Sequence, residues 1–495
     1  MTSGISGPAT VAYASRDVVS GRSDVDVLRA FAIAVGICWS VLFVVIGLRY
    51  ELQMYADGSI FSYAIAARDA WAFHWHNISD RLFVYLFCHL PAETYVELTG
   101  DPYGGIMVYG FLFFVAPLLG LTATFAADRS QGRIIFSYAC LSTACLCPLV
   151  FGFPTEMWMA HAVFWPTLAL CLGSPTSWRG TAAVFAALLA LVFTHEGALV
   201  LSAAILFTVL LRGWRDGKFV RALGAFCVVL TVWAAVKLTI RPDDYIADVM
   251  AAAAFKFIDI RNLAQPAFLS LLAALAGFGT LLVLLGWINL PIPHVFAVAA
   301  CAGALVIYWI GFDDSLLTDA RYNLRTLLLI MIPILGVLAS VHAMDDAERR
   351  SSPFPFLEPW ATAVEAVVNR QIAAGALLLI MLIHAVETTK FVLAWSDYKR
   401  TVRALATDTA SDRSSPLFVS SGRVGDELNR LAWNSTTPYL SVLVAPGLAP
   451  TRLVVDPDAG YFWLSCQNAL QSEATSTAIP AAARQLVRIH ACLHR

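Results

Sequence analysis

The chain has 495 residues, of which 59% are Ala, Val, Ile, Leu, Met, Phe, Trp, Tyr or Cys and 14% are charged, with a formal net charge of −2. Soluble domains carry about 25% charged residues, so this chain has too few polar side chains to cover a surface in water. The composition also excludes disordered, collagen-like and disulfide-knot proteins, and the small net charge gives no electrostatic basis for binding nucleic acid. The sequence therefore predicts an all-α polytopic membrane protein that contacts membrane lipid.

Windows of about 20 predominantly apolar residues predict about eleven transmembrane helices. They lie at 29–48, 104–126, 134–153, 157–173, 180–194, 197–212, 222–240, 266–287, 294–311, 323–343 and 372–395. Residues 1–28 precede them as a polar, charged segment that is unlike a cleaved signal peptide. The transmembrane domain is thus expected over 29–399, with a long first outer loop at 49–103.

The charges of the connections predict the orientation. One alternating set, 1–29, 127–133, 174–180, 212–221, 288–294 and 342–371, holds 13 basic and 10 acidic residues. The other set, 49–103, 154–158, 194–197, 241–265 and 312–325, holds 8 basic and 16 acidic residues. Cytoplasmic loops carry the excess of Lys and Arg, so the first set and the N-terminus are expected in the cytoplasm. An odd number of spans then puts the C-terminus outside, in the periplasm if the membrane is a bacterial inner membrane, which the Ala- and Trp-rich composition favours.

Residues 400–495 are polar enough to form a small α/β domain outside the membrane. Three short runs predict strands and two predict helices: Pro416–Ser420, Tyr439–Ala445 and Arg452–Asp456, then Asp426–Trp433 and Ile479–Leu493. Cys466 and Cys492 are the two cysteines of this region, and such a pair suggests one disulfide in an oxidising compartment.

The first outer loop holds the most distinctive residues. Residues 59–76, with the sequence SIFSYAIAARDAWAFHWH, combine aromatic and spaced polar side chains as interfacial helices do. Asp57 comes just before them, in Tyr55-Ala56-Asp57-Gly58. A carboxylate at the membrane surface can act as a general base, and the same residue can also be a turn or a helix N-cap.

Other polar residues interrupt the apolar sequence on the same predicted side. Glu156 precedes one span, and His195-Glu196 lies in a tight turn between two others. Near-membrane ionisable residues are costly and mark candidate sites, although Glu156 can also stabilise a helix N-terminus and His195 can be an interfacial hydrogen-bonding residue. Arg321 and Arg325 share one helical face, where they suit a phosphate or anchor the helix at the interface.

The sequence gives little support for a metal centre or a nucleotide site. His74 and His76 would point about 200° apart on a helix. A divalent cation, Mg²⁺ or Mn²⁺, could bind to oxygen ligands from Asp57, Glu156 or Asp313, but no metal-ligand spacing demands it. Motifs of the GxxxxGK[ST] and GxSxG kinds are missing from the chain, which argues against ATP hydrolysis and serine hydrolase chemistry.

This layout resembles the GT-C superfamily of polytopic membrane glycosyltransferases. The similarity covers the topology of the whole chain: an early acidic residue in a long first outer loop, many later spans and an outer C-terminal domain. At the level of individual residues, the similarity is specific mainly at Tyr55-Ala56-Asp57-Gly58. Family members often have two acidic residues where this chain has Asp-Gly, so Glu51 and Asp69 are alternative bases.

The resemblance implies an inverting transfer of a hexose or pentose from a polyprenyl-phosphate donor to a glycan, lipid or protein acceptor of the cell envelope. Asp57 would be the general base, and Glu156 would position the acceptor or the sugar. The residues expected to contact the sugar or the lipid phosphate are His195, Glu196, Arg321, Arg325, Trp71 and His74.

The main alternative function is transport, by a flippase or a carrier of a small polar substrate, with the same charged groups lining a pathway. Charges near the bilayer midplane would favour it. Most ionisable residues instead cluster at the outer interface, with His384, Glu387 and Lys390 as the main exceptions. A polysaccharide ligase or polymerase and a structural role in an envelope complex are further alternatives.

Overall fold

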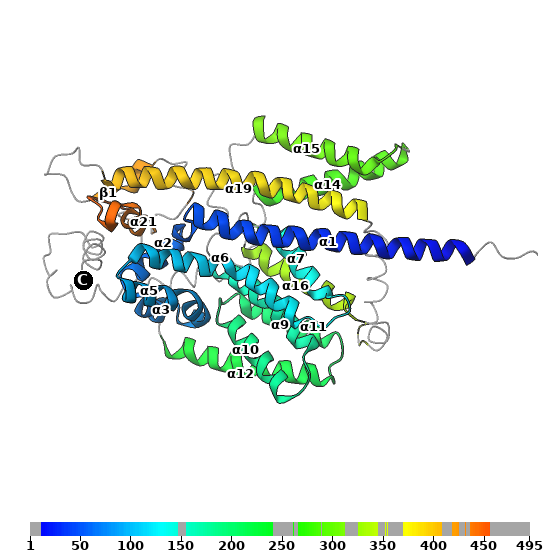
Figure 1. Cartoon of the computed structure of the whole chain (residues 1–495), viewed down its shortest axis with the longest axis horizontal. Helices are drawn as coiled ribbons and strands as arrows, with labels where there is room; N and C mark the ends of the chain where they lie inside the picture. Colours follow the sequence, from blue (N-terminus) through cyan, green and yellow to red (C-terminus); the bar gives the residue numbers. More distant parts are fainter. Residues whose placement is uncertain are drawn as a thin grey trace, which may run out of the picture.

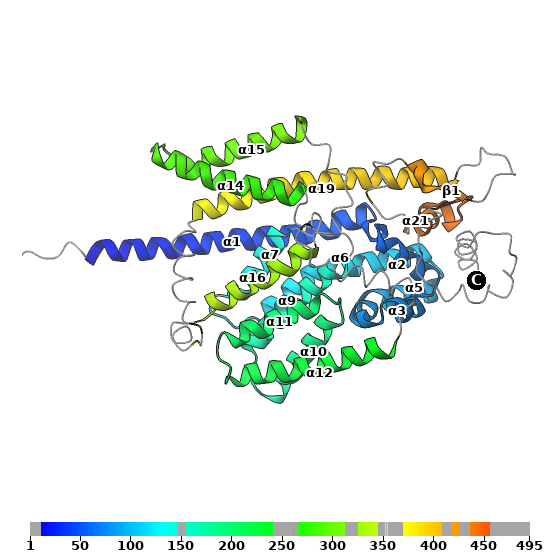
Figure 2. The same ribbon diagram turned by 180° about the vertical axis from the view of Figure 1, so that it is seen from behind.

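Long apolar helices that run side by side make up most of the computed structural model (Figures 1 and 2). The structure describes residues 11–146, 155–240, 261, 266–288, 290–311, 325–344, 352, 354, 370–407, 418–424, 431 and 436–455. Six helices in these ranges are long and apolar enough to cross a bilayer. The protein is therefore a multi-pass membrane protein whose spans contact lipid.

The helices of the bundle coincide with all eleven predicted windows. They are α1 (Val11–Arg49), α6 (Pro102–Ala127), α7 (Ile134–Cys145), α9 (Glu156–Gly173), α10 (Trp178–Val192), α11 (Ala198–Leu210), α12 (Gly217–Thr239), α14 (Pro266–Trp287), α15 (Pro293–Gly311), α16 (Arg325–His342) and α19 (Arg370–Thr407). The number of spans is not confirmed, because α10 and α11 have 15 and 13 residues. At 1.5 Å per residue they are about 20 Å long, less than the bilayer core of about 30 Å.

Small residues set the closest contacts between helices. A Cβ added at Gly120 of α6 would lie 2.4 Å from the Ala162 carbonyl oxygen of α9, and one at Gly36 of α1 would lie 2.3 Å from the Cys140 carbonyl oxygen of α7. The helix backbones approach each other where these glycines face them, as in other membrane helix pairs. Helix α9 also packs against α7, α10, α11, α12 and α16, which makes it the central helix.

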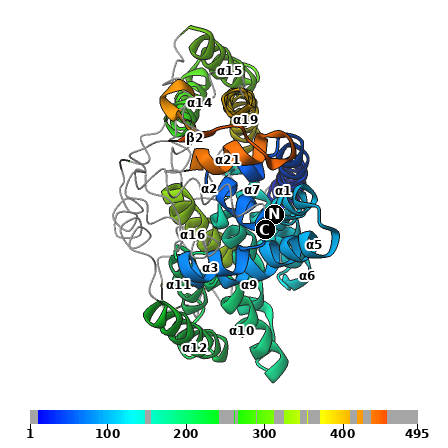
Figure 3. The same cartoon turned by 90° about the vertical axis from the view of Figure 1, so that its left-hand side faces the viewer.

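The first outer loop is largely helical. It contains η1 (Leu52–Met54), α2 (Asp57–Ala66), α3 (Ala70–Asn77), η2 (Ser79–Arg81), α4 (Leu82–Val84), η3 (Tyr85–His89) and α5 (Leu90–Thr99). The helix expected over 59–76 is two helices, because Arg68 adopts a φ of 54° between α2 and α3. These elements gather at one end of the bundle (Figure 3), which we call the loop end.

The described connections of the two predicted sets lie at different ends. The loop end contains residues 49–103, the start of α9, the α10–α11 turn and the ends of α12 and α19 (Figure 1). At the opposite end, Lys218 donates a hydrogen bond to the carbonyl oxygen of Leu172 (2.8 Å), and Arg221 donates one to that of Ser174 (3.3 Å). Within the described residues, the connections of each set therefore share one end of the bundle.

The described part of the C-terminal region lies on the loop end. It comprises β1 (Phe418–Ser420), η6 (Ser421–Val424), α21 (Thr437–Val444), η8 (Pro446–Leu448) and β2 (Leu453–Val455). Two of the three predicted strands, Pro416–Ser420 and Arg452–Asp456, are confirmed as β1 and β2. The two strands are parallel, with Phe418 opposite Leu453. Helix α21 packs on α2 and α19, and α19 continues through residue 400.

The strand predicted at Tyr439–Ala445 is wrong, because this segment is helix α21. Residues 437–443 are all buried, and a short run that is apolar on every side fits a buried helix as well as a buried strand. Pro438 in the first turn favours a helix start. The helices predicted at Asp426–Trp433 and Ile479–Leu493 lie mainly or wholly outside the described residues, as do Cys466 and Cys492.

Candidate functional site

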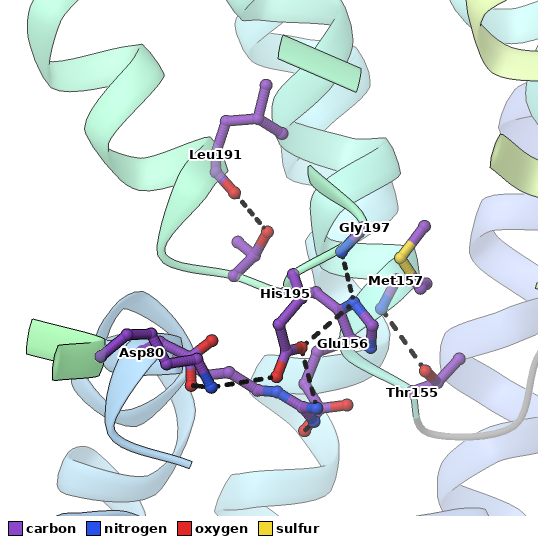
Figure 4. Close-up of polar contacts among 11 residues, drawn as sticks. Asp80, Thr155, Glu156, Met157, Leu191, His195 and Gly197 are labelled. Atoms are coloured by element: carbon purple, nitrogen blue, oxygen red, sulfur yellow. Dashed lines mark hydrogen bonds and ion pairs between the residues drawn. The ribbon is translucent and has the colours of Figure 1, made fainter. Parts of the chain in front are cut away.

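Charged residues from four distant segments meet at the loop end (Figure 4). Element η2 supplies Asp80 and Arg81, the start of α9 supplies Glu156, the α10–α11 turn supplies His195 and Glu196, and the end of α12 supplies Lys237. We call these six residues the ion cluster. A backbone hydrogen bond from Phe83 N–H to the Phe193 carbonyl oxygen (3.0 Å) joins the first loop to the α10–α11 turn beside it.

Arg81 is the centre of the ion cluster. Its Nη1 lies 2.9 Å from Glu156 Oε1, and its Nη2 lies 3.0 Å from Glu196 Oε2. The side chains of Arg81 and Glu156 are only 16% and 4% exposed. Burial disfavours the charge of Arg81, but the nearby carboxylates of Glu196, Glu156 and Asp80 outweigh it and raise the pKa of the guanidinium. The same contact with Arg81 helps to hold the pKa of Glu196 below its usual value, against the effect of burial.

Lys237 completes the ion cluster from the other side. Its Nζ lies 2.8 Å from Asp80 Oδ1 and 3.5 Å from Glu196 Oε1. The Asp80 side chain is 1% exposed, and its burial, with the charge of Glu196, raises its pKa although Lys237 and Arg81 act against this. When His195 is neutral and the other five side chains are ionised, the cluster has two cations and three carboxylates. Its cations are therefore already neutralised.

His195 has a defined arrangement in the turn. The Gly197 N–H donates a hydrogen bond to His195 Nδ1 (3.0 Å), and Glu196 Oε2 lies 3.5 Å from the same nitrogen. A nitrogen that accepts from a backbone amide cannot carry a proton in the neutral ring. We therefore assign the proton of neutral His195 to Nε2.

The sequence predicted part of this cluster. Glu156, His195 and Glu196 were candidates, and the structure brings them together. Asp80 and Arg81 enter the sequence analysis only as charges of the first outer loop, and Lys237, inside the predicted span 222–240, is not singled out. The sequence signal that could have identified the two cations is their charge: Arg81 and Lys237 lie on the predicted outer side, where acidic residues predominate.

Asp57 lies in a strained turn. It begins α2 and is half-buried. The preceding Ala56 has φ 49° and ψ −128°, a conformation that is unfavourable for a residue with a Cβ and costs about 1–3 kcal/mol. Ser59 Oγ donates to the carbonyl oxygens of Ala56 (2.9 Å) and Thr436 (3.1 Å), and the Tyr55 hydroxyl donates to the Leu431 carbonyl oxygen. The C-terminal region thus holds the turn in place.

A buried tyrosine lies near both Asp57 and the ion cluster. Tyr109 of α6 is fully buried, and its hydroxyl lies within electrostatic range of both Asp57 and Glu156. This hydroxyl has no hydrogen-bond partner among the residues that the structure describes. Tyr109 is therefore a buried hydroxyl near both carboxylates.

Aromatic and histidine rings extend from Tyr109 to the surface. The His89 ring centroid lies 5.3 Å from that of Tyr109, and Tyr85 lies 5.2 Å from His74 and 5.0 Å from Trp71. Trp71 is 46% exposed, whereas His74 and His89 are buried. Burial lowers the pKa of His89 to about 3. Burial, with the nearby Arg81 and His89, holds the pKa of His74 well below its usual value. Both rings are neutral at pH 7.

The other predicted residues have separate places. Glu51 is bound by Lys399 and Tyr103, which makes it a weaker candidate base than Asp57. His161 accepts a hydrogen bond from Trp165 Nε1 (3.3 Å) and contacts Ser142 Oγ at 2.8 Å, as a core histidine does. Arg325 begins α16, and Arg321 and Asp313 lie outside the described residues.

No group of three or more His, Cys, Asp or Glu side chains within the described ranges is placed to hold a metal ion. The ion cluster instead uses its carboxylates to bind Arg81 and Lys237. No protein-family model matches the chain, and no curated protein matches it significantly. The geometry of the loop end therefore carries the functional argument.

Proposed function

We propose that the protein is a membrane glycosyltransferase of the GT-C type, with Asp57 as its general base. The observation that carries this proposal is the strained backbone of Ala56, which positions the half-buried Asp57 at the loop end. Strained residues that the surrounding structure holds in place cluster at active sites. Here the hydrogen bonds of Tyr55 and Ser59 to the C-terminal region hold this turn.

The proposed reaction uses a polyprenyl-phosphate sugar as donor. Asp57 takes the proton of an acceptor hydroxyl, whose oxygen forms a bond to the anomeric carbon of the sugar. The bond from that carbon to the phosphate oxygen breaks on the opposite face, so the configuration inverts and polyprenyl phosphate leaves.

The other residues have supporting roles in this proposal. Trp71 stacks on the sugar, and the neutral His74 offers it hydrogen bonds. Arg321, Arg325 and His195 stabilise the departing phosphate, since Arg81 is already neutralised by Glu156 and Glu196. Glu156 acts through Arg81 by positioning the first loop, and Glu196 does the same from the α10–α11 turn.

The proposal places the loop end and the C-terminus in the periplasm of a bacterial inner membrane, with the N-terminus in the cytoplasm. The charge counts of the two sets of connections support this orientation. This mechanism does not require a divalent cation, because Asp57 is the base and Arg321 and Arg325 stabilise the charge of the phosphate. The acceptor is a hydroxyl of the cell envelope.

The test uses the purified full-length protein in nanodiscs with a panel of polyprenyl-phosphate sugars and a mixture of envelope glycans as acceptors. We expect one donor to raise the unfolding temperature and to release free polyprenyl phosphate. A panel in which no donor binds or reacts would contradict the proposal. Movement of the intact lipid-linked sugar across a liposome membrane, without its cleavage, would instead establish transport.

A further inference from the structure

A cavity of about 490 Å³ lies at the loop end, apart from the ion cluster. Its lining includes Glu51 at the end of α1, Tyr103 at the start of α6, three basic residues of α19 and residues 443–448 around η8. None of these side chains belongs to the proposed catalytic turn. We call this cavity the basic cavity.

The basic cavity has more cations than carboxylates. Lys399, Arg400 and Arg403 line it together with the single carboxylate of Glu51. Lys399 and Arg403 are four residues apart on α19 and so share a helical face. The lining therefore carries a formal charge of +2, the opposite of the excess of carboxylates in the ion cluster.

Glu51 is fully occupied by residues of the cavity wall. Its Oε2 lies 2.6 Å from Lys399 Nζ, and its Oε1 accepts a hydrogen bond of 2.5 Å from the Tyr103 hydroxyl. Lys399 also donates to the Tyr50 carbonyl oxygen at 2.7 Å. These contacts join α1, α6 and α19. Arg400 and Arg403 remain as the groups of the lining that can bind a ligand.

The two arginines are open to an anion. No carboxylate lies within ion-pair distance of the Arg403 guanidinium among the described residues, although the charge of Glu51 interacts with it at longer range, and Arg400 contacts the exposed Asp397 at 3.1 Å. Arg400 is 77% exposed, so an incoming anion can compete with this contact at little cost. Two guanidinium groups three residues apart suit the tetrahedral oxygens of a phosphate.

The position of the basic cavity along α19 fits a phosphate at the membrane surface. Trp395 and Tyr398 precede the basic residues, and Trp395 Nε1 donates to the Tyr50 carbonyl oxygen at 3.0 Å. Both rings are fully buried in the protein, so they fix this part of α19 against its neighbours. The three cations follow the apolar window of α19 that ends near residue 395, and Lys and Arg at the end of a span reach the headgroup region.

We propose that the basic cavity is a binding site for a phosphate group, carried either by an anionic lipid or by a soluble phosphate ligand. Arg400 and Arg403 bind the phosphate oxygens, and Lys399 with Glu51 fixes the wall. The site is separate from Asp57 and does not depend on the proposed sugar transfer.

The experiment measures binding to the full-length protein. Phosphatidylglycerol binding is followed by native mass spectrometry against phosphatidylcholine, and inorganic phosphate binding is followed by thermal shift at constant ionic strength. We expect Arg400→Gln with Arg403→Gln to weaken binding by about tenfold for each arginine removed. Arg215→Gln is the matched control, because Arg215 is exposed beside Trp214 at the opposite end.

The two arms identify the source of the phosphate. Loss of both phosphatidylglycerol and inorganic phosphate binding in the double variant supports a site open to soluble ligands, and loss of the lipid alone supports a headgroup site. Arg400→Lys with Arg403→Lys should recover part of the affinity, which separates a lost charge from a misfolded protein. The proposal is wrong if the wild type binds neither probe or if the Gln variant binds as the wild type does.

Discussion

The ion cluster and the basic cavity lie at the same end of the bundle and use the same residue types in opposite balance. In the ion cluster, Arg81 and Lys237 meet three carboxylates and are enclosed. In the basic cavity, three cations meet one carboxylate, and two of them are exposed. A buried cluster whose cations are all paired with carboxylates fixes the chain segments that contribute to it, whereas exposed cations in excess remain available to a ligand. The balance of charge therefore separates a structural role from a binding role.

The largest test of this comparison removes the centre of the ion cluster. Arg81→Ala leaves the carboxylates of Glu156 and Glu196 buried without their partner, which costs about 3–5 kcal/mol of stability. The same change at Arg403, which is exposed, should cost within about 0.5 kcal/mol. Unfolding of both variants in detergent, followed by tryptophan fluorescence, measures the difference. Equal stabilities would show that the ion cluster does not hold the loop end together.

The second test uses pH. The pKa of His89 is lowered from 6.5 to about 3 by burial, so the folded state favours the neutral ring. Its contribution to stability is fully present above pH 6.5 and is lost as the pH falls towards 3, at about 1.4 kcal/mol per pH unit. His89→Phe, beside the rings of Phe61 and Tyr109, removes this titration.

We therefore expect the stability of the wild type to fall more steeply between pH 6.5 and 4.5 than that of His89→Phe. Thermal unfolding across this range, on both proteins in the same buffers, cancels the contributions of the shared acids. Parallel curves would show that His89 does not lie buried and neutral in the folded protein.

The smallest test concerns the single carboxylate of the basic cavity. Glu51→Gln removes the ion pair with Lys399 and should cost about 1 kcal/mol, while the formal charge of the lining rises to three cations. Phosphate affinity should then increase. Isothermal titration with inorganic phosphate measures it, and an affinity that stays the same or falls would contradict the role of charge excess in this cavity.

The sequence predicts the coarse fold well because the hydrophobic windows are long. Every window contains a helix. Helices α10 and α11 are shorter than a bilayer-spanning helix, so the number of spans does not follow from the windows alone. The error at Tyr439–Ala445 has a physical origin: a short segment buried on all sides carries no periodic pattern that separates helix from strand.

The sequence predicts the site less completely because its residues come from distant segments. Glu156, His195 and Glu196 stand out as acids or histidines beside apolar spans. Arg81 lies in a loop among other charges, and only the fold brings it within 2.9 Å of Glu156. The backbone of Ala56 has no sequence signal at all, since alanine rarely adopts a positive φ.

The most direct test of the account compares the wild type with Asp57→Asn in single-turnover release of polyprenyl phosphate from the donor that the panel identifies. Asp101→Asn is the control, because Asp101 caps α6 through the Gly104 N–H at 3.0 Å and asparagine caps equally well. We expect Asp57→Asn to keep the thermal shift with donor and to lose about 10²–10⁴-fold in rate, while Asp101→Asn reacts as the wild type does. A folded Asp57→Asn protein with full turnover would show that Asp57 is not the base.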